Sequence, residues 1–160
     1  MDSLSNFTKK EVCLDALMPL IKETLSEGKS ITFMPRGISM LPMLKQGRDS
    51  VTISPIKGDL KRFDIPLYQR NDGKYVLHRI VKTGDTYTCI GDNQFVLEKG
   101  LCKEQMIAVV TSFTRKGKAH KVSDAGYRFY VVFWHYSRPV RHVIRALKNR
   151  LKRLLKKRGR

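Results

Sequence analysis

Between Ser30 and Phe113, short runs of β-branched and aromatic residues alternate with turn residues, and this alternation constrains the fold more than any other feature. The runs are Ile31–Met34, Ser50–Ile53, Ile65–Gln69, Tyr75–Val81, Thr86–Ile90 and Met106–Phe113. Asn71-Asp72-Gly73 and Thr83-Gly84-Asp85 are typical hairpin turns between such runs. The pattern predicts a mainly β fold, a coiled antiparallel sheet or partly open β-barrel of about six or seven strands.

An amphipathic helix is predicted before the first strand. Thr8-Lys9-Lys10-Glu11 has the spacing of a capping box, and apolar residues then recur on one helical stripe. Pro19 falls inside this pattern and allows a kink or a break, and Gly28 is a typical helix end. The helix is expected over about residues 9–27, packed on the domain that follows it. Its stripe consists of Leu14, Leu17, Met18, Ile21 and Leu25.

The formal net charge of +18 lies almost entirely in the C-terminal part of the chain. Residues 115–160 hold sixteen Lys/Arg and one acid, whereas residues 1–114 hold sixteen Lys/Arg and thirteen acids. After Pro139, apolar residues recur every three or four positions among basic ones, which predicts a basic amphipathic helix of about sixteen residues. The chain therefore divides into an N-terminal helix (1–28), a β-domain (29–122) and a basic, aromatic tail (123–160).

A strongly basic tail favours an anionic partner. Its aromatic residues and amphipathic helix favour an anionic membrane surface, with the protein peripheral to the membrane and otherwise cytoplasmic. Nucleic acid is the alternative partner, and a helix that packs its apolar stripe on the β-domain is the structural alternative. The residues expected at the membrane interface are Phe129, Trp134, Arg141, Arg145, Lys148 and Lys152.

Cysteine spacing and the length of the apolar runs argue against several classes of protein. Cys13, Cys89 and Cys102 form no Cys-x-x-Cys pair, so we expect reduced thiols and no metal site. No run approaches about 18 consecutive apolar residues, which argues against a transmembrane helix. Charged residues between positions 9 and 15 also interrupt any signal-peptide core.

A serine in a tight turn is the first candidate for catalysis. Ser39 follows the first predicted strand, Gly37 lets the backbone approach a ligand, and Pro42 fixes the turn after it. In such a rigid position the N–H of the serine, with a neighbouring N–H, can face a developing oxyanion. Gly37, Ile38, Met40 and Pro42 are therefore expected to form the substrate and oxyanion site. Taken alone, a Gly-x-Ser turn is more often structural.

His78 and Asp92 would complete a Ser-His-Asp set. His78 is expected inside a strand, on the same face as Val76 and Ile80. An apolar face keeps an imidazole neutral and able to accept a proton. Asp92, in Gly91-Asp92-Asn93, is expected to orient the histidine or to support the floor of the site. Each residue also has a structural reading, as a satisfied core histidine and as a turn aspartate.

Three segments together resemble the motifs of type I signal peptidases. Gly37-Ile38-Ser39-Met40-Leu41-Pro42 is similar to their nucleophile box, Ser-Gly-Ser-Met-x-Pro. Tyr75-Val76-Leu77-His78-Arg79-Ile80-Val81 resembles their general-base strand, and Gly91-Asp92-Asn93 resembles their Gly-Asp-Asn box. The order and spacing also agree, over roughly residues 30–112. The base position holds histidine, as in the endoplasmic-reticulum and archaeal branch, whereas most bacterial members and the related self-cleaving repressors use lysine.

The resemblance implies a signal-peptidase-like fold with Ser39 as nucleophile, His78 as base and Asp92 as third member. It also implies a polypeptide substrate that adds as an extended strand, and no metal or organic cofactor. The chain departs from the family pattern in three places. Position 37 is glycine, without a hydroxyl for the oxyanion hole; Phe63 precedes Asp64 where Gly-Asp is common; and Gln94 and then Glu98 follow Asn93 where the family often has another aspartate.

These observations predict a serine endopeptidase that cleaves an extended polypeptide. Two alternatives remain on the sequence. One is self-cleavage, as in the repressor-like branch, for which Ala125-Gly126 is a candidate bond. The other is a non-catalytic module of the same fold, held to a membrane or to nucleic acid by its tail.

Overall fold

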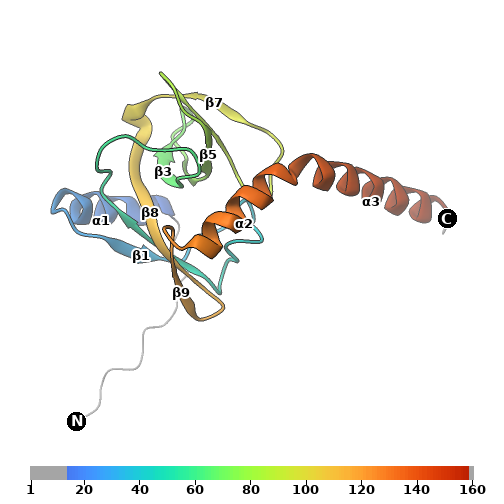
Figure 1. Ribbon diagram of the computed structural model, residues 1–160, viewed down its shortest axis with the longest axis horizontal. Coiled ribbons are helices and arrows are strands. Elements are labelled where there is room, and N and C mark those ends of the chain that lie inside the picture. The colour runs from blue at the N-terminus through green and yellow to red at the C-terminus, as the bar shows by residue number, and fades with distance from the viewer. Residues whose placement is uncertain (1–13, 159–160) are drawn as a thin grey trace, which may run out of the picture.

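The computed structural model describes residues 14–158, without the side chains of residues 152–154 and 156–158 (Figure 1). Its strands form two antiparallel sheets. The larger sheet has six strands, in the order β1-β2-β8-β3-β4 with β9 paired to β8, and the smaller sheet has the order β5-β6-β7. The predicted mainly β class is therefore confirmed, and the strands within the described range do not close into a barrel.

Most of the predicted strands are present with bounds that shift by a residue or two. The strands are β1 (Ile31–Phe33), β2 (Ser50–Ser54), β3 (Pro66–Gln69), β4 (Tyr75–Leu77), β5 (Arg79–Lys82), β6 (Tyr87–Ile90), β7 (Glu98–Leu101), β8 (Met106–Arg115) and β9 (Lys118–Lys121). The helices are α1 (Leu14–Ser26), the 3₁₀ turn η1 (Lys103–Gln105), α2 (Ala125–Tyr136) and α3 (Arg138–Arg158).

Strand β8 is the central strand of the larger sheet and pairs with β2, β3 and β9. Its alternating residues Ala108 and Val110 are fully buried, as the period of a half-buried strand requires. Helix α1 packs against this core through Met18 and Ile21, which are 3% and 0% exposed. The predicted packing of the N-terminal helix is therefore confirmed, and Pro19 lies inside α1 without ending it.

The end of helix α1 also agrees with the sequence. Gly28 follows the helix with φ of 75°, a left-handed conformation that favours glycine. The capping box predicted at residues 8–11, and the helical residues 9–13 with Cys13 among them, lie outside the described residues. The thiols of Cys89 and Cys102 are free, and Cys89 is buried.

The single strand predicted over Tyr75–Val81 is wrong, because the chain changes sheets at His78. Strand β4 pairs with β3 in the larger sheet, and β5 pairs with β6 in the smaller one. Val76 and Ile80 still share a face across the break, since both pack with Tyr68 in a core cluster separate from the one that α1 covers. His78 therefore lies at the junction of the two sheets.

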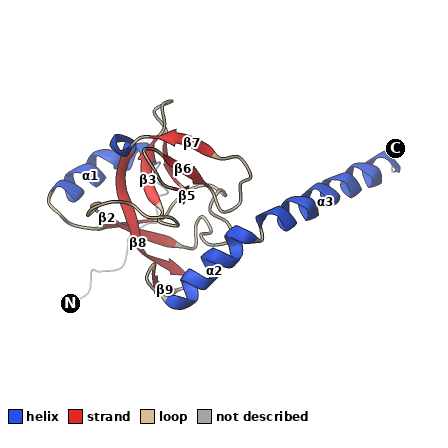
Figure 2. Ribbon diagram, turned by 45° about the horizontal axis from the view of Figure 1, so that its top comes forward, coloured by secondary structure: helices blue, strands red, loops and turns tan. Residues whose placement is uncertain are grey.

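The tail forms two helices, α2 and α3, and α3 extends away from the sheets (Figure 2). Helix α3 has 21 residues, longer than predicted, and it begins at Arg138, with Pro139 in its first turn. Among the helices of residues 14–158, none is both long and apolar enough to cross a membrane.

Candidate active site

Ser39 lies in the loop between β1 and β2, on a backbone that glycine makes possible. Gly37 has φ of 94°, and its N–H donates to Gln46 Oε1 at 2.8 Å. Ile38 is 66% exposed, Ser39 is half-buried, and Met40 is 5% exposed. Within the described residues, neither the hydroxyl nor the N–H of Ser39 forms a hydrogen bond. Both groups are thus free for a ligand.

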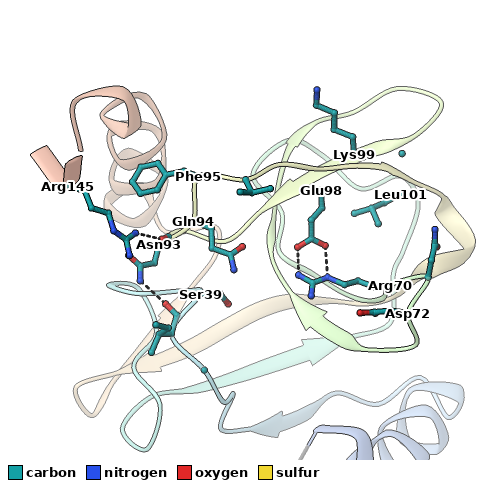
Figure 3. Close-up of a pocket in the computed structure, with 15 residues that line it drawn as sticks. Ser39, Arg70, Asp72, Asn93, Gln94, Phe95, Glu98, Lys99, Leu101 and Arg145 are labelled. Carbon is teal, nitrogen blue, oxygen red and sulfur yellow. Dashed lines mark hydrogen bonds and ion pairs between the residues drawn. The ribbon is translucent and has the colours of Figure 1, made fainter. Parts of the chain in front are cut away.

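The Gly91–Asn93 turn holds the Ser39 loop in place. The Asn93 N–H donates to the Ser39 carbonyl at 2.8 Å, and Asn93 Nδ2 donates to the Ile38 carbonyl at 3.2 Å (Figure 3). A Cβ at position 91 would lie 2.7 Å from the Ser39 carbonyl oxygen, closer than real Cβ contacts. Glycine at 91 therefore allows the two loops to meet.

The contacts of Asp92 fit the second role expected of it, support of the site floor, and not orientation of the histidine. Its carboxylate is 1% exposed and accepts two hydrogen bonds from Arg79, from Nε at 2.8 Å and from Nη2 at 2.7 Å. Arg79 also donates to the Phe63 carbonyl and to the Tyr127 hydroxyl. A buried guanidinium needs such a carboxylate, so Asp92 serves the core under the turn and not the imidazole.

Glu98 is the carboxylate that faces His78. His78 is 1% exposed, and its Nδ1 lies 2.9 Å from Glu98 Oε1 and 3.3 Å from the Tyr68 hydroxyl. The Tyr68 hydroxyl in turn donates to Glu98 Oε2 at 2.7 Å. Because the Glu98 carboxylate lies beside Nδ1, it favours the neutral ring that carries its proton there and keeps the lone pair of Nε2 for an incoming proton.

Burial and charge set the protonation states of this pair. Burial lowers the pKa of His78 below its usual 6.5, and this outweighs the opposite effect of Glu98. Burial alone would raise the pKa of Glu98, but hydrogen bonds from Arg70 and Tyr68 bring its pKa below the ordinary value. Arg70 pairs with both Glu98 oxygens. At neutral pH the site therefore holds a neutral imidazole beside an ionised carboxylate.

Sequence reasoning noted Glu98 only as an acid after the Gly91–Asn93 turn. Strand β7, which carries Glu98, was not predicted, because Glu98–Leu101 has no alternation of apolar residues. Pairing of β7 with β6, and of β6 with β5, brings Glu98 back toward the residue that precedes β5. The sequence offered an acidic residue at this position, but no strand pattern that would have placed it beside His78.

Ser39 lines two hollows. A groove of about 1000 Å³ has Ser39 on one side and Glu98 with Arg70 on the other (Figure 3). A smaller hollow of about 250 Å³ contains Ser39 and Leu77. Both hollows connect Ser39 with a residue next to His78. In the groove this residue is Glu98, which contacts the His78 ring, and in the smaller hollow it is Leu77, which precedes His78 in the chain.

Among the hydrogen bonds of the described residues, none joins the Ser39 hydroxyl to the His78 ring. Catalytic hydrogen bonds in free enzymes are often long or poorly aligned, and they tighten when the substrate binds. The other predicted substrate residues keep their place in this loop. Gly37 and Ile38 line the groove, Met40 lines the smaller hollow, and Pro42 follows Leu41 in a cis peptide.

Three residues expected at a membrane interface contact the β-domain instead. Trp134 Nε1 donates to the Asp92 carbonyl at 2.9 Å. Arg141, whose guanidinium lies 3.7 Å from the centre of the Trp134 ring, donates to the same carbonyl at 3.4 Å. Arg145 donates to the Asn93 carbonyl at 3.3 Å. These side chains satisfy carbonyls of the turn that holds Ser39. Phe129 and Lys148 are exposed, and the Lys152 side chain lies outside the described residues.

Comparisons of the chain with protein-family models, with curated proteins and with solved structures found no match. The candidate bond for self-cleavage, Ala125-Gly126, lies in the first turn of α2 and not in an extended segment. The interpretation of the site therefore rests on the geometry described above.

Proposed function

We propose that this protein is a serine endopeptidase of the signal-peptidase-like type. Ser39 is the nucleophile, His78 is the general base, and Glu98 orients His78. The observation that carries the proposal is the pair of buried His78 and half-buried Glu98, whose Nδ1 and Oε1 lie 2.9 Å apart, with Glu98 lining the same groove as Ser39. A serine is a weak nucleophile until a positioned base takes its proton, and this pair is such a base.

The mechanism follows from these roles. As Ser39 Oγ attacks a peptide carbonyl, His78 Nε2 takes the hydroxyl proton, and Glu98 stabilises the imidazolium that forms. The N–H of Ser39 donates to the oxyanion. His78 then returns the proton to the leaving amine, and the acyl group remains on Ser39. A water activated by the same imidazole hydrolyses the ester and regenerates the enzyme.

The shape of the groove supports a polypeptide substrate. Ile38 and Val96, which line it, are 66% and 77% exposed and offer apolar contacts to an extended chain. The smaller hollow beside Ser39 has an apolar lining, including Leu17, Met34 and Leu44, and fits a substrate side chain. Main-chain hydrogen bonds and such pockets are the general means of binding an extended peptide.

The backbone at Phe63 supports the resemblance to signal peptidases at a position where the sequence departs from it. The family pattern has glycine before the aspartate here, and Phe63 has φ of 79°. This left-handed region favours glycine and is rare for a bulky residue. Phe63 thus holds a conformation that a glycine at this position would adopt without strain.

A comparison of polypeptide termini in cells tests this proposal. Cells would produce the wild type, Ser39→Ala or Ser123→Ala; Ser123 is exposed, lines neither hollow and is the matched control. We expect some polypeptides to stay uncleaved in the Ser39→Ala cells and to be cleaved in the other two. An identical set of termini in all three would contradict the proposal.

A further inference from the structure

The outward face of the tail carries an unbroken apolar stripe. Its side chains recur at helical spacing along α2 and continue along α3, and each is between 42% and 75% exposed. Monomeric proteins rarely expose a contiguous apolar surface of this kind without a use for it. This tail stripe consists of Phe129, Val132, Phe133, Tyr136, Val140, Val143, Ile144, Leu147, Leu151 and Leu155.

The β-domain contacts the tail stripe at Tyr136, whose hydroxyl accepts from Arg62 at 3.4 Å, and leaves the stripe residues of α3 exposed. Its other contacts with the tail lie on another face, through Trp134, Arg141 and Arg145, and the His142 ring packs on Phe95 at 4.8 Å. Beyond these contacts α3 points away from both sheets (Figures 1 and 2). The part of the stripe on α3 runs from Val140 to Leu155, which is about 22 Å at 1.5 Å per residue.

The charge on α3 indicates what covers the stripe. Its sequence holds ten Lys/Arg and no Asp or Glu. At 3.6 residues per turn, Lys148 and Arg150 flank the stripe on opposite sides, and both are exposed. A second copy of the chain would bring two such helices together against their own repulsion. Nucleic acid would use the charges and leave the apolar side chains in water. An anionic bilayer surface uses both.

We propose that the tail stripe lies in the plane of an anionic membrane surface. The apolar side chains enter the boundary between headgroups and acyl chains, and the flanking basic side chains bind the lipid headgroups. Because Arg145 lines the same groove as Ser39, this docking holds the groove beside the membrane. The binding uses none of Ser39, His78 or Glu98, so it holds or fails independently of the proposed peptidase activity.

Co-sedimentation of the full chain with phosphatidylcholine vesicles, prepared with and without phosphatidylserine, tests the proposal. We expect binding to the phosphatidylserine vesicles that weakens as salt is added. Leu147→Gln with Leu151→Gln is expected to weaken binding at least about tenfold, because buried methylenes are lost. Lys148→Gln with Arg150→Gln is expected to weaken binding about thirtyfold. Each basic residue near an anionic surface contributes a similar amount to the binding free energy, about five- to sixfold in affinity.

Leu20→Gln is the matched control, because Leu20 is 52% exposed on α1, away from the tail stripe, and its loss leaves binding unchanged. Circular dichroism checks that each variant is folded. Absence of binding to phosphatidylserine vesicles by the folded wild type would overturn the proposal. So would vesicle binding that the leucine pair does not affect, together with tight binding to duplex DNA, because charge alone would then explain the tail.

Discussion

Two carboxylates lie at this site, the half-buried Glu98 and the buried Asp92, and they have different partners. Glu98 lies beside His78 Nδ1 and accepts from Arg70, whereas both oxygens of Asp92 accept from Arg79. The sequence motif draws attention to Asp92, whereas the proposed mechanism gives the orienting role to Glu98. Substitutions at the two positions should therefore change different properties of the protein.

Glu98→Gln is expected to reduce kcat at neutral pH by about 10²–10⁴-fold, because the imidazole loses the group that holds its tautomer and stabilises its charge. The pH profile should change as well. Activity requires neutral His78, whose lowered pKa places the acid limb of kcat/KM below pH 6.5. Glu98 raises that pKa, so its removal moves the acid limb to still lower pH.

The matched control is Glu104→Gln, since Glu104 is exposed in the 3₁₀ turn after β7. Its pH–rate profile should coincide with that of the wild type. Unchanged kcat and an unchanged acid limb in Glu98→Gln would remove Glu98 from the mechanism.

Asp92→Asn is expected to act on stability. Breaking a buried ion pair from one side costs about 3–5 kcal/mol, because Arg79 remains buried without its counter-charge. The double variant Arg79→Met with Asp92→Leu should recover part of that loss, since no buried charge is left. Denaturant unfolding measures both. A stable Asp92→Asn protein that has lost cleavage would instead return Asp92 to a catalytic role.

Helices and strands that have a local sequence pattern could be predicted, whereas those that depend on pairing with distant strands could not. The strands with apolar alternation and both hairpin turns were predictable, and so was helix α1 from its stripe. Strands β7 and β9 are mostly polar, and only their partners β6 and β8 make them strands. The break at His78 likewise depends on pairing in two different sheets.

The same division applies to the site. Ser39 and His78 stand out in the sequence because each lies in a distinctive local setting. Glu98 does not, because its role depends on β7 folding back across β6. The roles of Trp134 and Arg145 also depend on tertiary contact, since nothing local shows that a basic, aromatic helix will satisfy carbonyls of a distant turn.

Gly91→Ala tests whether the Gly91–Asn93 turn positions Ser39. The added Cβ would lie 2.7 Å from the Ser39 carbonyl, so the loop must shift. A displacement of about 1 Å in a catalytic group costs on the order of 100-fold in rate. We expect such a fall in kcat, measured by peptide cleavage. Gly126→Ala is the control, because a Cβ there meets nothing within 4 Å, and equal rates in both variants would contradict this role.

The whole molecule combines a nearly neutral body with a basic tail. Residues 1–114 carry thirteen acids against sixteen Lys/Arg, and residues 115–160 carry one acid against sixteen. The groove is formed by the body with Arg145 of the tail, and the tail stripe belongs to the tail. The two parts meet at the carbonyls of Asp92 and Asn93, directly beside the loop of Ser39.

If both proposals hold, membrane docking should favour substrates at the lipid surface. Phosphatidylserine vesicles are expected to raise the cleavage rate of a lipid-anchored peptide several-fold or more, through a higher local concentration. Leu147→Gln with Leu151→Gln should abolish this increase and leave cleavage of the same peptide without its lipid unchanged. An equal increase in wild type and variant would contradict the coupling of docking to activity.

The most direct test of the central claim is the cleavage of a mixture of synthetic peptides by the purified protein, followed by mass spectrometry. The account predicts cleavage by the wild type and by Ser123→Ala, and a loss of up to about 10⁶-fold in Ser39→Ala. Cleavage at the wild-type rate by Ser39→Ala would contradict the assignment of Ser39 as the nucleophile.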